Sequence, residues 1–164
     1  MGIIQDQLIL RDFALFVIEG IRNNIRTKDY TGYGPSNNTG TTAASLGYEW
    51  DGKKLVIFTT RGTSLRALEV GRPPTQKDEG GVLRGRILQW VQQRGITDPN
   101  TSQESIAYLI SRKIHREGTI IWRKFGKVGG NTGVVTDFIN ADAIDKLVSD
   151  LGTFVYSEIN ALYE

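Results

Sequence analysis

The chain contains no cysteine and a single histidine among its 164 residues. Without thiolates, no disulfide and no cysteine-ligated metal site can form, which excludes a disulfide-built secreted scaffold. One histidine is also too few for the common transition-metal sites. This residue, His115, is flanked by Lys113 and Arg116, with no carboxylate at a spacing that would orient it as a base. We predict an ordinary surface residue there, and expect neither a metal nor another cofactor.

The chain also lacks an excess of charge and any long apolar run. Twenty Lys and Arg residues face 18 Asp and Glu residues, a net charge of +2, so overall charge gives no argument for nucleic-acid binding. No run approaches the roughly 20 apolar residues that a membrane span needs. Residues 1–6 have neither the basic start nor the cleavage site of a signal peptide. We therefore expect one soluble intracellular domain covering residues 1–164, without a membrane partner.

Catalytic patterns are missing as well. The serines stand in no nucleophile-elbow context. The glycine-rich run at 126–133 has its lysine, Lys127, too early for a phosphate loop, which places that lysine after the last glycine. The chain is accordingly not expected to be an enzyme, and we predict no catalytic residue.

Helical periodicity is the clearest pattern that is present. Apolar residues at intervals of three and four predict helices over 3–26, 83–94, about 101–117 and about 137–162. The third should begin near Thr101, where Thr101-Ser102-Gln103-Glu104 has capping-box spacing. The fourth carries a continuous apolar seam that either packs on the domain's own sheet or is shared with a neighbouring subunit: Ile144, Val148, Leu151, Val155, Ile159 and Leu162.

Residues 43–60 are typical of a β-hairpin. Apolar residues alternate before Asp51-Gly52, which favours a two-residue turn, and an apolar strand follows it. Three glycine-rich or polar segments, at about 27–42, 75–82 and 119–133, are predicted to be long flexible loops.

A proline pair follows the hairpin in the stretch 67–74. Because each proline fixes its φ angle and lacks an N–H, the chain must leave regular structure at Gly71-Arg72-Pro73-Pro74. Glu69 and Arg72 are three residues apart beside these prolines. They either form a short rigid presenting segment or are solvated charges of a plain exposed loop.

Cations cluster between residues 112 and 127, with Trp122 and Phe125 among them and Glu117 as the one opposing charge. Three interpretations stay open. Basic residues with aromatics can bind and stack a nucleic acid, as in a small nucleic-acid-binding module. They can meet an acidic protein surface, or they are cations favoured by a helix C-terminus. The cluster comprises Arg112, Lys113, Arg116, Arg123, Lys124 and Lys127.

The order of these patterns resembles a known family. After an N-terminal helix come Asn38-Thr39-Gly40 with Ala44-Ser45-Leu46, the hairpin, and Leu68-Glu69-Val70-Gly71-Arg72-Pro73-Pro74. The later matches are Ile87, Trp90-Val91, Arg94-Gly95-Ile96, Ala107, Ile110, Ile114 and Gly118-Thr119, and then the long last helix. Over roughly residues 38–162 this is similar to the neck and tail-completion (head–tail joining) proteins of tailed bacteriophages.

The resemblance implies an α+β fold: a small, mostly antiparallel sheet with the N-terminal helix, two middle helices and the long C-terminal helix packed on it. It implies a structural virion protein at the head–tail junction, made in the host cytoplasm. About six to twelve copies would form a closed ring between the portal, adjacent neck proteins and the tail, with DNA passing through the lumen without sequence specificity. Glu69 and Arg72 would then be structural residues, and they join the six cations as interface or lumen candidates.

Overall fold

The computed structural model describes residues 2–32, 34, 40–61, 64–75 and 81–161, with no side-chain description for 2–5, 159 and 161. The predicted loops at 27–42 and 75–82 lie partly outside these ranges, and so does Leu162. The first element, α1, covers Gly2–Thr27 and confirms the predicted N-terminal helix. Its buried stripe forms the centre of the core: Ala14, Val17, Ile18, Ile21 and Ile25.

The hairpin that α1 covers is the only sheet among the described residues. A short helix, α2 (Thr41–Ala44), leads into β1 (Leu46–Trp50), which pairs antiparallel with β2 (Leu55–Thr59). Trp50 is opposite Leu55, so a four-residue loop joins the strands and the predicted two-residue turn is wrong. The reason is the Asp51 carboxylate, which accepts the N–H groups of Lys53 and Lys54 at 2.9 and 2.8 Å and thereby stabilises a longer turn.

A pair of packed helices follows the hairpin. The single-turn helix α3 (Leu65–Glu69) precedes residues 71–75, which are called the proline segment below. Helices α4 (Val82–Gln93) and α5 (Gln103–Glu117) follow and pack on each other. The N-cap of α5 is Ser102, whose hydroxyl accepts the N–H of Ser105, so the helix starts slightly later than the predicted Thr101.

Residues 119–133 differ from the predicted irregular loop. They contain α6 (Ile120–Lys124) and the 3₁₀ turn η1 (Gly126–Val128). Thr119 caps α6 by accepting the N–H of Trp122. Periodicity could not reveal so short a helix, because five residues contain little more than one turn.

The last helix, α7, covers Ala141–Ala161 and starts four residues after the predicted Asp137. Asn140 caps it, because its side-chain oxygen accepts the N–H of Ala143 at 2.9 Å. The structure confirms the α+β class, with long helices at both ends of the chain. It adds that α1 packs on both strands while α7 packs on α1.

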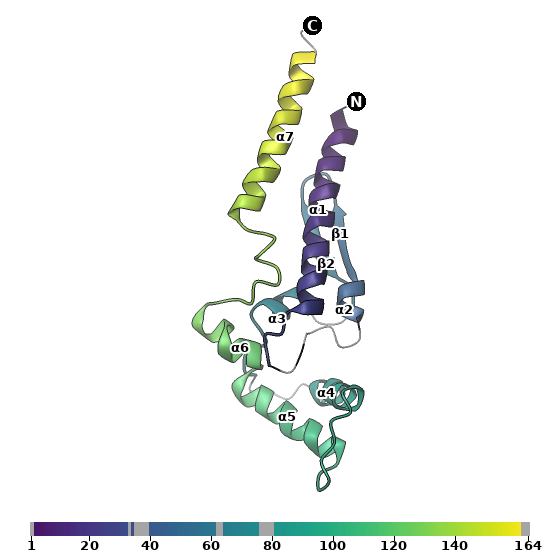
Figure 1. Ribbon diagram of the computed structural model, residues 1–164, viewed down its shortest axis with the longest axis vertical. Coiled ribbons are helices and arrows are strands. Elements are labelled where there is room, and N and C mark those ends of the chain that lie inside the picture. Colours follow the sequence, from purple (N-terminus) through teal and green to yellow (C-terminus); the bar gives the residue numbers. More distant parts are fainter. Residues whose placement is uncertain (1, 33, 35–39, 62–63, 76–80, 162–164) are drawn as a thin grey trace.

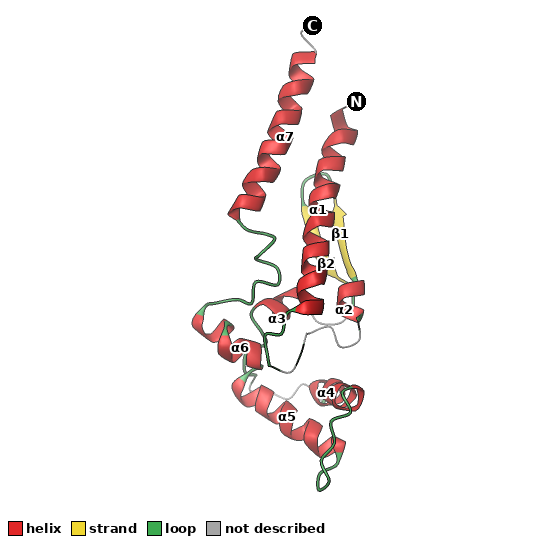
Figure 2. Cartoon of the chain, viewed as in Figure 1, coloured by secondary structure: helices red, strands yellow, loops and turns green. Residues whose placement is uncertain are grey.

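Figures 1 and 2 show an elongated molecule. Helices α1 and α7 lie side by side and run in opposite directions, and the described ends of the chain point the same way. The hairpin lies behind α1, and α4 and α5 form the opposite end of the molecule. The C-terminal end of α7 and the α4–α5 pair are therefore far apart in one protomer.

Candidate interaction surfaces

Glu69, a predicted interface or lumen residue, is 8% exposed and lies inside the protomer. Its carboxylate accepts the N–H of Val135 at 2.8 Å, and the hydroxyl and N–H of Thr136 at 2.6 and 3.3 Å. Its backbone oxygen also accepts the N–H of Thr132 at 2.9 Å. Glu69 therefore ties the end of α3 to the segment that leads into α7.

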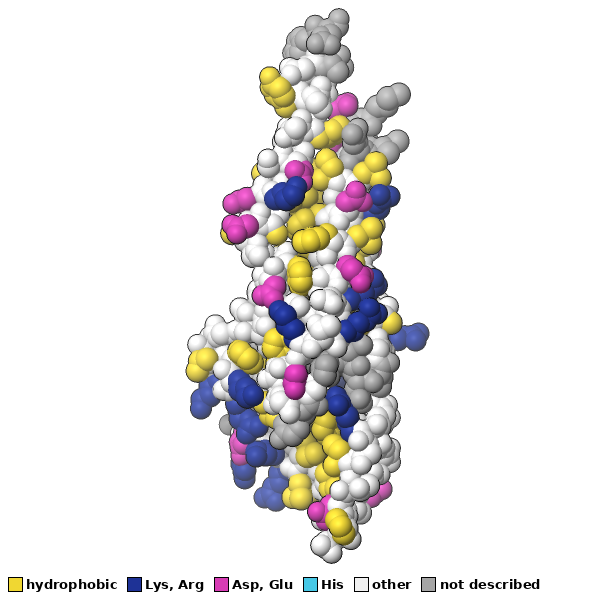
Figure 3. Space-filling model, viewed as in Figure 1, with side chains coloured by type: hydrophobic (Ala, Val, Ile, Leu, Met, Phe, Trp, Pro, Cys, Tyr) yellow, Lys and Arg dark blue, Asp and Glu magenta, His cyan; other side chains and the backbone are white. Residues whose placement is uncertain are grey.

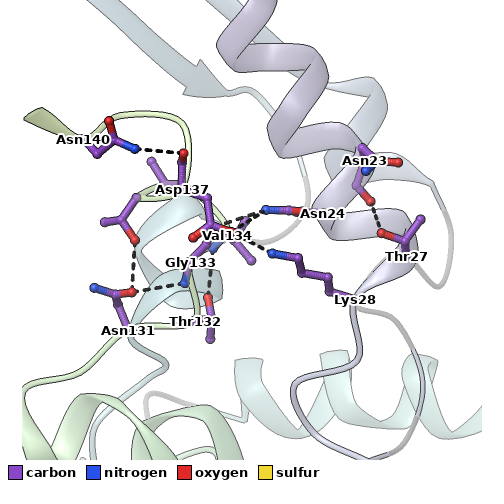
Figure 4. A network of polar contacts seen from close by, with 12 residues as sticks. Asn23, Asn24, Thr27, Lys28, Asn131, Thr132, Gly133, Val134, Asp137 and Asn140 are labelled. Carbon is purple, nitrogen blue, oxygen red and sulfur yellow. Dashed lines mark hydrogen bonds and ion pairs between the residues drawn. The ribbon is translucent and has the colours of Figure 1, made fainter. Parts of the chain in front are cut away.

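The same segment is tied to the end of α1, as Figure 4 shows. The buried Asn24 donates its amide N–H to the Gly133 oxygen at 3.2 Å and to the Asp137 carboxylate at 3.4 Å. Lys28 pairs with that carboxylate at 2.7 Å, and this hydrogen bond raises the lysine's pKa. The start of α7 is thus held by contacts from both α1 and α3.

The proline segment lies against α5 and α6. Arg72 donates its N–H to the Thr119 hydroxyl at 3.0 Å and accepts the Thr119 N–H at 3.0 Å. Gly71, at φ 78°, leaves no room for a side chain, because a Cβ there would meet the backbone of Trp122. These contacts support the rigid-segment interpretation of Arg72-Pro73-Pro74, with the Arg72 side chain half-buried at the surface.

His115 takes part in the same packing. Its backbone oxygen accepts the Thr75 N–H at 2.9 Å, and its Nδ1 lies 2.6 Å from the Thr75 hydroxyl. The ring is half-buried, so the predicted plain surface residue is instead a contact between α5 and the proline segment.

The structure separates the six cations of residues 112–127, the basic segment, into two that form ion pairs and four that are exposed. Arg116 and Arg123 both pair with Glu117, at 2.6 and 2.8 Å, and the hydrogen bond from Arg116 is the main cause that lowers the pKa of this carboxyl. The other four are exposed, on α5, α6 and η1: Arg112, Lys113, Lys124 and Lys127. Figure 3 shows Lys and Arg side chains gathered over this part of the molecule.

The two aromatics of the basic segment pack internally. A Cβ at Gly118 or at Gly126 would meet the Trp122 ring, so the indole lies against both glycines. Phe125 makes an edge-to-face contact with Tyr30, with ring centroids 6.5 Å apart. Neither ring is presented for stacking on bases, which leaves the nucleic-acid interpretation with the cations alone.

Helix α7 exposes three residues of the predicted apolar seam, whereas Leu151 is half-buried and the side chains of Ile159 and Leu162 lie outside the described residues. Ala143 and Leu147 line a pocket together with residues of α1, and Phe154 is buried at 9% exposure. The seam lies on an adjacent face, where Ile144, Val148 and Val155 are 45, 61 and 48% exposed. Such an exposed apolar stripe is typical of an interaction surface.

An open groove of about 610 Å³ lies between α3, α4, α5 and α6. Its apolar lining comes mainly from isoleucines and from Trp90 of α4. Four cations line it as well, of which all but Arg94 are predicted interface or lumen residues: Arg72, Arg94, Lys113 and Arg123. These cations come together only because segments far apart in the chain pack on each other, so no local sequence pattern predicts the groove.

Charge is also unevenly distributed along the chain. Residues 82–128 contain nine Lys and Arg against three Asp and Glu, a net charge of +6. Residues 129–164 contain one lysine against six carboxylates, a net charge of −5. The near-neutral total therefore hides one basic and one acidic part, which the fold places in the α4–α6 region and in α7.

Other kinds of site find no support in the part of the chain that the structure describes. No group of three or more His, Asp or Glu side chains there could hold a metal ion. No described helix has the length and apolar content needed to cross a membrane. Comparisons with protein-family models, curated proteins and solved structures found no match.

Proposed function

We propose that this chain is a structural subunit of the head–tail connector of a tailed bacteriophage. Copies assemble into a ring that joins the portal to the tail and through which DNA passes. The resemblance of residues 38–162 to neck and tail-completion proteins supports the proposal, as does the absence of a catalytic pattern in the sequence.

The observation that carries self-assembly is the exposed seam of α7. Fully burying an exposed aliphatic side chain contributes roughly 1.5–3 kcal/mol, and covering the exposed parts of Ile144, Val148 and Val155 contributes a fraction of this for each residue. Further apolar side chains on the neighbouring α1 are exposed as well: Leu8, Leu15 and Phe16. One protomer leaves these surfaces to solvent, whereas a ring would cover them.

The test is the solution mass of the full chain, by light scattering at two concentrations and two salt levels, with electron microscopy of the same sample. We expect a discrete mass that is a multiple of 18.2 kDa, and rings with a central opening. A monomer under every condition would contradict the proposed self-assembly.

A matched pair of variants identifies the surface. Val148→Asp places a charge in the seam and should give monomers that keep the wild-type circular dichroism, because this side chain is 61% exposed. Ser149→Asp adds the same charge one residue later on an exposed position outside the seam, and should assemble normally. Equal behaviour of the two variants would show that the seam is not the assembly surface.

A further inference from the structure

Helix α7 combines an apolar stripe with acidic flanks. It carries four carboxylates against one lysine, and Asp150 already pairs with that lysine, Lys146, at 2.7 Å. Asp145 follows Ile144 directly, and Glu158 lies three residues after Val155, so these two exposed carboxylates border the stripe. A matching partner surface is therefore apolar in its centre and positively charged at its edges.

The groove between α3, α4, α5 and α6 has these properties. Trp90, Ile110 and Ile114 contribute to its apolar lining, while Arg72 and Lys113 add positive charge. Among the described residues, no carboxylate pairs with either of these two cations. At about 610 Å³ the groove is within the range of pockets that bury a ligand, roughly 300–1,000 Å³, and can accept several side chains.

We propose that α7 of one copy docks in this groove of the next copy, head to tail. The inference rests on the proposed ring and names its subunit contact. It brings the acidic flanks, Asp145 and Glu158, against the cations Arg72 and Lys113, and it buries the seam on the apolar lining. Complementary charges of this kind select the partner and fix the register.

The fold itself argues for a contact between two different surfaces. Helices α4 and α5, which line the groove, form one end of the protomer, whereas α7 extends toward the other end, so a chain does not fill its own groove (Figure 1). Pairing α7 with α7 would bring like-charged helices together, which is unfavourable. A contact between unlike surfaces leaves each copy with one unpaired helix and one open groove, and such a contact gives a ring when the rotation between successive copies closes.

Charge reversal tests the pairing. The groove variant is Arg72→Glu with Lys113→Glu, and the helix variant is Asp145→Lys with Glu158→Lys. The swap variant carries all four changes, and Lys53→Glu with Lys54→Glu reverses two exposed charges at the hairpin turn as a control. Mass is measured against concentration for each full-length protein, and circular dichroism checks the fold.

We expect the groove variant and the helix variant each to need about a hundredfold higher concentration to assemble, because two like-charge contacts replace two attractive ones. The swap variant should assemble at close to the wild-type concentration, since both charges are exchanged. An equimolar mixture of the groove and helix variants should also assemble, because acidic and basic surfaces then alternate around the ring. The control should match the wild type.

The outcomes separate this inference from the proposed function. If both charge-reversed variants formed rings at the same concentration as the wild type, the α7–groove contact would be overturned. The proposed ring would still stand, and the groove would bind another partner. Loss of assembly in each variant without recovery in the swap would overturn the pairing of these two surfaces. A wild-type protein that stays monomeric at every concentration would overturn the ring and the contact together.

Discussion

The Glu69 carboxylate joins α3 to residues that are more than sixty positions later in the chain, and its removal gives a direct test of the fold. Glu69→Ala removes the acceptor of three hydrogen bonds, to the N–H of Val135 and to the N–H and hydroxyl of Thr136. These donors lie in the segment that leads into α7. The variant therefore tests whether α3 holds that segment in place.

The magnitude follows from the chemistry of the contacts. A hydrogen bond to a charged group contributes about 1.5–3 kcal/mol, and three that share one carboxylate do not add fully. We expect Glu69→Ala to lower the free energy of unfolding by about 3–4 kcal/mol. Glu69→Gln keeps one acceptor oxygen and should lose about half as much.

Urea unfolding followed by circular dichroism measures both losses. With a slope of about 2 kcal/mol per molar urea, the midpoint of Glu69→Ala should fall by roughly 1.5–2 M. If the wild type assembles, the Val148→Asp background makes the transition independent of protein concentration. Glu49→Ala, on the exposed side of β1, is the control and should change stability by about 0.5 kcal/mol or less. A loss below about 1 kcal/mol for Glu69→Ala, with an unchanged slope, would refute this account of the segment.

Two further predictions concern a glycine and a carboxylate. Gly71→Ala should destabilise the protein by about 2 kcal/mol or more, because φ is positive at this position and a Cβ would meet Trp122. Gly85→Ala should instead stabilise the protein by about 0.5–1 kcal/mol, because Gly85 is a helical position with open space around it. Urea unfolding compares the two variants, and equal effects would contradict the prediction. Hydrogen bonds from backbone N–H groups, with Gly34 first and Thr31 next, lower the pKa of Asp29 from 3.8 to about 2. The stability that this carboxylate provides should therefore be present above its ordinary pKa of 3.8 and be lost as pH falls toward 2, a dependence that Asp29→Asn removes. An NMR titration midpoint near 3.8 for the Asp29 carboxyl would contradict it.

Local patterns were sufficient for the elements that are long and periodic. The predicted helices over 3–26 and 83–94 match α1 and α4 within one residue at each end, because a stripe of apolar side chains repeats through several turns. The same reasoning missed α6, which is too short for a period, and placed the start of α7 four residues early. Asp137 is not the cap of α7, because its carboxylate binds Asn24 and Lys28 near the end of α1.

The candidate site was less predictable, because its parts are distant in the chain. The sequence allowed Glu69 to be part of a rigid presenting segment or a solvated loop charge, but its partners Val135 and Thr136 are 66 and 67 residues away. Trp122 and Phe125 suggested base stacking, and only the packing against Gly118, Gly126 and Tyr30 reveals their structural role. Where a side chain's partner is far away in sequence, its type and neighbours do not determine its environment.

The seam of α7 differs from Glu69 and the two aromatics, because its apolar period correctly predicted a long helix but did not determine what the apolar stripe contacts. Period and length alone allowed both packing on the domain's own sheet and contact with a neighbouring subunit. The structure leaves Val148 and Val155 largely exposed and Leu151 half-buried, so the protomer covers only part of the stripe. Helix α7 is twenty-one residues long and carries an exposed apolar stripe with acidic residues beside it. In this it differs from a solvated surface helix, whose outer face is polar. The charges that flank the stripe give the second argument, because a basic surface of matching character exists on the same chain and out of reach of its own α7. We therefore propose that these two surfaces, which lie on different parts of one protomer, meet between copies of the chain.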